Sequence, residues 1–143
     1  AQALAAPTRA AHDTAAALTR TVLTDPGLRE CGYGAWAGRP MAKVAAAEPE
    51  LFARWLSDPA AAPPGGEPLS GLLERAQHWL ADRIGTPATT LAVVPPALLR
   101  ALVVVALELP AARFWRLDAA PLGVSRLTVQ NGRWRLAGFN ATL

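Results

Sequence analysis

The sequence contains a single cysteine, Cys31, among its 143 residues. A lone thiol excludes a disulfide within the chain and leaves no Cys-x-x-Cys spacing of the kind that binds zinc. We therefore expect neither a metal site nor a cofactor. Cys31 itself is expected to serve as a small apolar side chain in the packing.

Lysine is scarce as well, and the basic residues never form a run. Lys43 is the one lysine among 14 basic residues, and the arginines are spread singly from Arg9 to Arg135. Proteins that bind nucleic acid gather positive charge into a patch or a stripe. The scattered pattern therefore argues against a nucleic-acid partner, despite a formal net charge of +3.

Long apolar stretches are also missing. The longest apolar run covers residues 101–107, which is far shorter than the roughly 20 residues that a membrane-spanning helix needs. We expect a soluble, cytoplasmic protein with no membrane partner.

What the sequence does contain is ample apolar material, 52% of the residues, for one packed core. We expect a single domain over residues 1–143. The apolar spacing predicts helices over residues 8–22, 41–56 with a break at Pro49, 69–84, 97–107 and 111–115. It predicts strands over residues 89–94, 124–129 and 134–136, the last two joined by an Asn131-Gly132 turn. This order indicates an α/β fold with unusually few strands.

Four segments have the spacing of motifs known together in one family. Residues 28–38 (Leu-Arg-Glu-Cys-Gly-Tyr-Gly-Ala-Trp-Ala-Gly) match a motif in which Leu-x-Glu precedes an aromatic residue and then Gly-x-Trp-Glu-Gly. Residues 64–67 (Pro-Gly-Gly-Glu) match a Pro-Gly-Gly-Glu-Ser loop, and Arg75 falls in the following helix. Residues 93–101 resemble a Val-Ser/Thr-His strand-to-helix turn, and residues 6–15 resemble Ser-Pro-x-x-Arg-Ala-x-x-Thr-Ala. The chain thus resembles the histidine phosphatase (phosphoglycerate mutase-like) superfamily over nearly its whole length.

The resemblance implies a three-layer αβα phosphoglycerate mutase-like fold, here lacking its N-terminal strands. Neither the strand that carries Arg-His-Gly nor the strand that enters Ala6-Pro7 is expected within this chain. The strand at Leu91–Val94 would then have an open edge. An upstream segment, a partner's strand or a second copy of the chain is expected to cover it, so the domain is expected to be N-terminally incomplete.

The family's chemistry implies a nucleophilic histidine, two phosphate-binding arginines, a second histidine and an acidic proton donor. No Arg-His-Gly occurs in the sequence. The spacing places Ala10 at one of the arginines, Pro95 at the second histidine and Ala37 at the glutamate of Trp-Glu-Gly. Glu30 alone stands where the family's acid would sit.

The candidate catalytic residues are accordingly two acids, Glu30 and Glu67. Glu30 would be a residual proton donor, with a solvated or capping role as the alternative. Glu67 would approach the ancestral pocket, with loop structure as the alternative. Candidate ligand-binding residues are Arg9, which lies beside a helix N-terminus, Arg29 and Tyr33, for which packing is the alternative. Both histidines, His12 and His78, match neither family histidine and are expected to be structural.

Three functions remain open on these residues. The first is a degenerate, phosphatase-like protein without phosphatase activity that binds a small anionic molecule or a protein partner. The second is an active phosphomonoesterase or mutase whose N-terminal catalytic segment lies upstream. The third is an enzyme that reuses the pocket for an acid-assisted elimination or cyclisation with Glu30 or Glu67.

Overall fold

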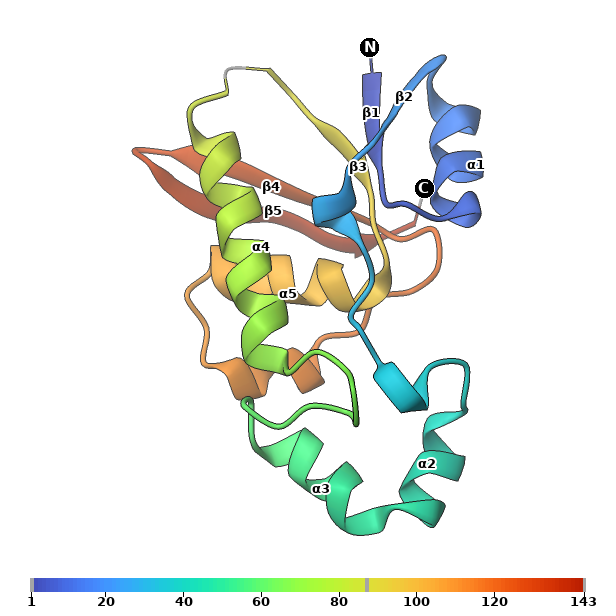
Figure 1. Cartoon of the computed structure of the whole chain (residues 1–143). Helices are drawn as coiled ribbons and strands as arrows, with labels where there is room; N and C mark the ends of the chain where they lie inside the picture. The colour runs from blue at the N-terminus through green and yellow to red at the C-terminus, as the bar shows by residue number, and fades with distance from the viewer. Residues whose placement is uncertain (1, 87, 143) are drawn as a thin grey trace.

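The computed structural model describes residues 2–86 and 88–142 and shows an α/β architecture (Figure 1). In chain order its elements are β1 (Gln2–Ala5), α1 (Arg9–Leu18), β2 (Thr21–Thr24), the short 3-10 helices η1 (Pro26–Leu28) and η2 (Gly34–Trp36), α2 (Met41–Ala47), α3 (Pro49–Ser57), α4 (Leu69–Ile84), β3 (Leu91–Val93), α5 (Pro96–Ala106), the 3-10 helix η3 (Ala111–Arg116), β4 (Val124–Gln130) and β5 (Arg133–Ala141).

Most of the expected elements are present at nearly the expected bounds. The helix expected over residues 69–84 is α4, and the break at Pro49 separates α2 from α3 because Pro49 begins a helix of its own. The turn between β4 and β5 is formed by Asn131 and Gly132, both with positive φ (53° and 73°). Such a pair suits the tight turn of an antiparallel hairpin.

The expectation for the first 24 residues was wrong in two respects. The segment Gln2–Ala5 forms the middle strand of a parallel sheet with the order β2-β1-β3, so the strand that enters Ala6-Pro7 is within this chain. Its Gln-Ala-Leu-Ala sequence has little β propensity, and burial rather than propensity decides its conformation. The first helix ends at Leu18 instead of continuing to Val22, because the chain turns into β2 at Thr21.

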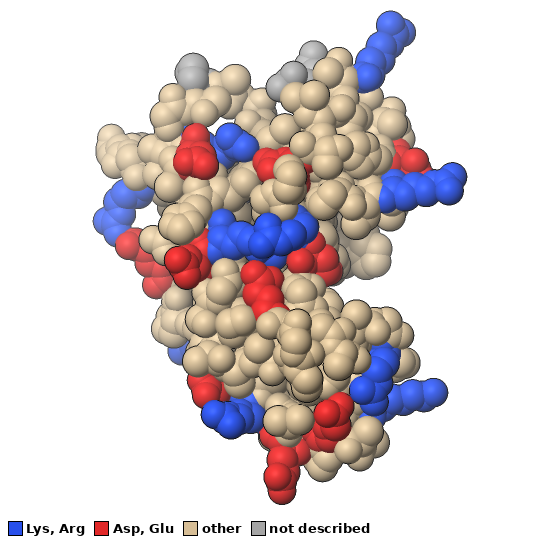
Figure 2. All heavy atoms as spheres, in the orientation of Figure 1, with Lys and Arg blue, Asp and Glu red and all other residues tan. Residues whose placement is uncertain are grey.

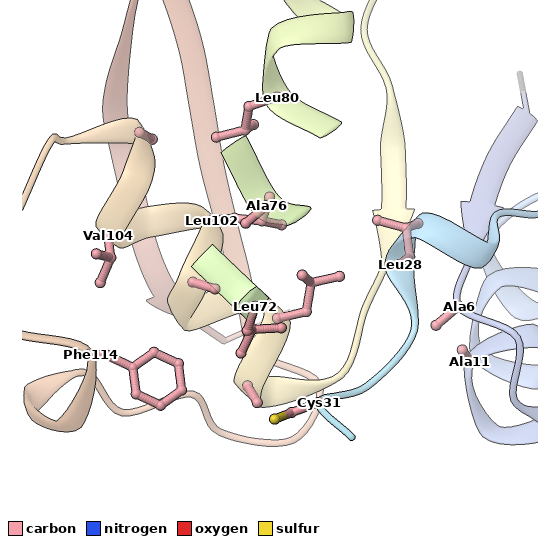
Figure 3. Packing of buried hydrophobic residues seen from close by; sticks show 14 of the residues in the cluster. Ala6, Ala11, Leu28, Cys31, Leu72, Ala76, Leu80, Leu102, Val104 and Phe114 are labelled. Carbon is pink, nitrogen blue, oxygen red and sulfur yellow. The ribbon is translucent and has the colours of Figure 1, made fainter. Parts of the chain in front are cut away.

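The layers are formed by helices on both sides of this sheet. Helix α1 lies on one side and α4 on the other (Figure 1), which agrees with the expected three-layer arrangement. Most of the core comes from α4 and α5 packed together, with Leu28, Cys31 and Phe114 beside them (Figure 3). A smaller cluster of Trp36, Val44 and Trp55 holds the lobe formed by α2 and α3.

The strand β3 is the least covered part of the sheet. Among the described residues it pairs with β1 on one side only, and β4 and β5 form a separate hairpin. Leu91 at its start is 41% exposed. Because β3 lies at the end of the strand order β2-β1-β3, it has the open edge that the sequence predicts. None of the described helices is long and apolar enough to span a membrane.

We expect the 143-residue chain on its own to self-associate through the open edge of β3, because unpaired backbone groups beside an apolar side chain favour strand pairing. Sedimentation velocity at increasing concentration measures this. Leu91→Lys should weaken the association, and Leu51→Lys, at an exposed position of α3, should not. A wild-type monomer that unfolds cooperatively would show that β3 needs no further strand.

Candidate functional site

The candidate site lies at the carboxyl ends of the parallel strands. The chain leaves β1 to enter α1, leaves β2 to enter η1 and residues 29–33, and leaves β3 to enter α5. In α/β sheets ligands bind beyond these strand ends. Figure 2 shows the surface indented between the block that contains the sheets and the lobe of α2 and α3, on the side toward which the strand ends point.

One guanidinium, that of Arg75 on α4, ties this region together. It donates to both carboxylate oxygens of Glu67, at 3.1 and 3.0 Å. It also donates to the backbone oxygens of Gly27 at 3.1 Å, Arg29 at 3.0 Å and Glu30 at 3.3 Å. All three guanidinium nitrogens are used, and the fork of Arg is suited to this kind of bidentate contact. Arg75 therefore fixes the path of the chain from Gly27 to Glu30.

Two glycine loops meet backbone to backbone beside this arginine. The Ala35 N–H donates to the Pro64 oxygen at 2.8 Å, and the Glu67 N–H donates to the Gly32 oxygen at 2.6 Å. A Cβ on Gly66 would lie 2.5 Å from the Gly32 oxygen, and one on Gly34 would overlap the Pro64 carbonyl. Two of the four motifs that carry the family resemblance, residues 28–38 and 64–67, are therefore joined by direct contact in the fold.

The first candidate acid, Glu67, is tightly paired. Its side chain accepts from Arg75 and, at 3.3 Å, from the Gly32 N–H. Burial alone would raise the pKa of Glu67, but the hydrogen bonds from Arg75 and Gly32 outweigh it and lower the pKa from 4.5. A carboxylate held in its charged form holds the loop well and donates protons poorly.

The second candidate acid, Glu30, has the opposite environment. Its Oε1 accepts from the Cys31 N–H at 2.9 Å. Burial raises the pKa of Glu30 above 4.5, and this hydrogen bond and the charges of Arg100 and Arg75 offset the shift only in part. A carboxyl that keeps its proton to higher pH has the property a general acid needs.

The two candidate arginines lie in different settings. Arg29 follows η1, donates to the Pro26 oxygen at 3.3 Å and helps to lower the pKa of Glu67 by its charge. Arg9 begins α1 with its side chain 94% exposed and paired with Asp13 at 3.7 Å. The hydrogen bonds of Arg75 thus join Arg29, Glu30 and Glu67 into one group. No hydrogen bond or ion pair among the described residues joins Arg9 to this group.

Tyr33, the last candidate, borders an apolar cavity of about 280 Å³. Its ring meets Trp55 edge-on, with centroids 6.4 Å apart. Burial raises the pKa of the Tyr33 hydroxyl to about 12. The sequence reasoning missed this cavity and its Arg100. The sequence signal that could have indicated the cavity is the presence of aromatic residues in three separate segments, at Tyr33, Trp55 and Trp115.

Pro95 and Ala10, which the motif spacing assigns to phosphate-chemistry positions, both lie beside helix starts. Pro95 precedes α5 at the end of β3, and Ala10 lies in the first turn of α1. His12 shares a hydrogen bond of 2.7 Å with Thr24 Oγ1, and His78 lies within α4. Within residues 2–86 and 88–142, no group of three or more His, Cys, Asp or Glu side chains is placed to hold a metal ion.

We expect Arg75→Lys to lower the free energy of unfolding by roughly 2–3 kcal/mol, because an ammonium cannot serve Glu67 and three backbone oxygens at once. Urea denaturation followed by tryptophan fluorescence measures the change. The control is Arg54→Lys. Arg54 forms an exposed ion pair with Asp58, with 4.0 Å between Nε and Oδ2, so this substitution should change stability little. Equal effects of the two substitutions would show that the Arg75 fork is not a main support.

The lowered pKa of Glu67 predicts a pH dependence of stability. A carboxyl whose pKa is lower in the folded state stabilises the fold above its unfolded pKa, and the contribution is lost as the pH falls through the folded value. Glu67→Gln should therefore lose less stability than wild type between about pH 5 and pH 3. Glu30→Gln should show the opposite trend, because the pKa of Glu30 is raised in the folded state and its protonation at lower pH favours the fold. Parallel urea midpoints for wild type and Glu67→Gln across this range would contradict the pairing.

Comparison with known proteins agrees with this geometry. The sequence matches the histidine phosphatase superfamily (branch 1) over residues 1–142. A bifunctional protein of Mycobacterium tuberculosis is 39% identical over 97 residues, which are 64% of this chain and 26% of that protein. The chain thus matches about a quarter of the length of this curated relative.

Solved structures of the same fold cover almost the whole chain. A mycobacterial glucosyl-3-phosphoglycerate phosphatase with inorganic phosphate is 27% identical, with a TM-score of 0.85 over 99% of this chain and 77% of that chain. A mycobacterial hydrolase is 26% identical, with a TM-score of 0.87 over 99% and 76%. By sequence match, fold and the joined glycine loops, this chain belongs to the histidine phosphatase superfamily.

Proposed function

We propose that this chain is a phosphatase-like domain that binds a small anionic molecule and does not hydrolyse phosphomonoesters. The observation that carries the proposal is Pro95, which follows β3 where the family resemblance implies a histidine. A proline ring has no N–H and no charge, so it can neither hydrogen-bond a phosphoryl oxygen nor stabilise its charge.

The remaining charges support binding rather than turnover. Arg29 is exposed beside the group that Arg75 organises, and Arg9 lies at the N-terminus of α1, where the helix dipole favours a negative charge. Neither of the two histidines lies at the ends of β1 or β3. Of the residues implied by the family's chemistry, Glu30 is the acid that remains.

A second candidate is an active phosphomonoesterase or mutase completed by another segment. The open edge of β3 favours it, because one more strand beside β3 would reach the same strand ends. The structural relatives named above include a phosphatase longer than this chain. An added strand would bring a nucleophile but would leave Pro95 and Ala10 as they are.

A third candidate is an acid-assisted elimination or cyclisation, which the raised pKa of Glu30 favours. Loss of turnover in a Glu30→Ala variant would separate this enzyme from a binding domain. The cytoplasmic location and the absence of a nucleic-acid partner stay predictions.

We expect the purified chain to bind inorganic phosphate without hydrolysing p-nitrophenyl phosphate above background. Loss of the nucleophile or of its main electrostatic partners typically costs on the order of 10³ in rate. A phosphate titration followed by NMR should shift the signals around Arg9 or Arg29, and absorbance at neutral pH measures hydrolysis.

Two outcomes would contradict this proposal. Hydrolysis that disappears in Glu30→Ala would show an active phosphatase, provided that it persists in Glu74→Ala, a control change at an exposed position of α4. Unmoved signals at both arginines would show that the strand ends have no anion affinity.

A further inference from the structure

The apolar cavity described above has the composition of a binding site for a ring. It lies between α3, α4, α5 and η3 and has a volume of about 280 Å³. Among its lining residues are five aromatic side chains: Tyr33, Phe52, Trp55, Phe114 and Trp115. Trp55 and Trp115 meet edge to face with centroids 4.7 Å apart. Since a cavity of about 150 Å³ accepts benzene, this one has room for a flat ring system somewhat larger.

One cation, Arg100 on α5, also lines the cavity. Its guanidinium carbon lies 4.6 Å from the centre of the Phe114 ring. Its Nε is buried and has no hydrogen-bond partner. None of the ion pairs found among the described residues includes Arg100. A buried donor on a charged group without a partner is costly, so the protein gains if an anion meets it.

The opening of the cavity is marked by two side chains that line it and are also exposed. These are Met41 and, at the end of α3, Leu56, which is 41% exposed. A ligand that enters there passes between the α2–α3 lobe and the rest of the domain. Its charged end can then meet Arg100, while its apolar part replaces water against the tryptophans.

We propose that this cavity binds a small amphipathic anion, a flat ring system with one negatively charged group, its ring against Trp55 and Trp115 and its charge on Arg100. The inference rests on the proposed function for the class of ligand, a small anion. It assigns that ligand to the cavity that Tyr33 and Arg100 line, and the one cation among the described residues of that lining suits a ligand with one negative charge.

Calorimetric titration with 2-naphthoate and its neutral analogue 2-naphthamide tests the assignment. Wild type should bind the carboxylate about tenfold more tightly than the amide, because a hydrogen bond to a charged group contributes roughly 1.5 kcal/mol or more. Arg100→Met should remove this preference and leave the affinity for the amide unchanged. Arg83→Met is the matched control: Arg83 also stacks on a ring, that of Trp79 at 4.5 Å, and has a buried Nε without a partner, but it does not line the cavity.

A second pair of variants tests the assignment without a change at Arg100, so the result does not depend on whether Arg100→Met folds. Leu56→Glu adds a like charge at the opening and should weaken 2-naphthoate binding severalfold. Leu51→Glu, at another exposed position of α3 that does not line the cavity, should leave binding unchanged. Equal affinity for both probes, no binding of 2-naphthoate, or equal effects of Leu56→Glu and Leu51→Glu would overturn the assignment.

The same samples distinguish this inference from the proposed function. If inorganic phosphate shifts the Arg9 or Arg29 signals and 2-naphthoate does not bind, the cavity assignment fails and anion binding at the strand ends stands. If 2-naphthoate binds with the expected dependence on Arg100 and phosphate shifts neither arginine, the assignment stands and the strand-end site fails.

Discussion

The arrangement around the strand ends depends on one bidentate ion pair, between Arg75 and Glu67. Its partners are mostly buried, with side chains 12% and 19% exposed. The same guanidinium also donates to three backbone oxygens of residues 27–30. It therefore couples the loop of Glu67, the helix α4 and the chain at Glu30 into one unit. Arg75 thus holds the backbone of Glu30, and the Glu30 side chain accepts from the Cys31 N–H.

The surroundings of Glu30 and Glu67 shift their pKa values in opposite directions, each for a different physical reason. Glu67 is charged because an arginine meets it, whereas burial without such a partner raises the pKa of Glu30. Opposite shifts in two neighbouring carboxyls are the usual way in which a site assigns different roles to the same chemical group. In this chain the contacts make Glu67 part of the loop structure, whereas the raised pKa of Glu30 keeps that carboxyl protonated to higher pH.

The sequence predicted the long helices and the hairpin well because their signals are local. The apolar spacing of α4 and the Asn131-Gly132 turn need no tertiary information. It failed at β1, since alanines at 0% exposure form a strand only because two other strands flank them. It also missed the cavity that Arg100 lines, because nothing local shows that residues from α3, α5 and η3 enclose one cavity.

The contact between the two glycine loops restricts which residues can occupy positions 34 and 66. Replacement of Gly34 or Gly66 meets backbone, which no change of side chain elsewhere can move aside. The chain therefore needs both glycines, and the Arg75 contacts beside them, in order to fold, independently of any reaction at the site. The features that mark this chain as a member of its family are therefore also features that its fold requires.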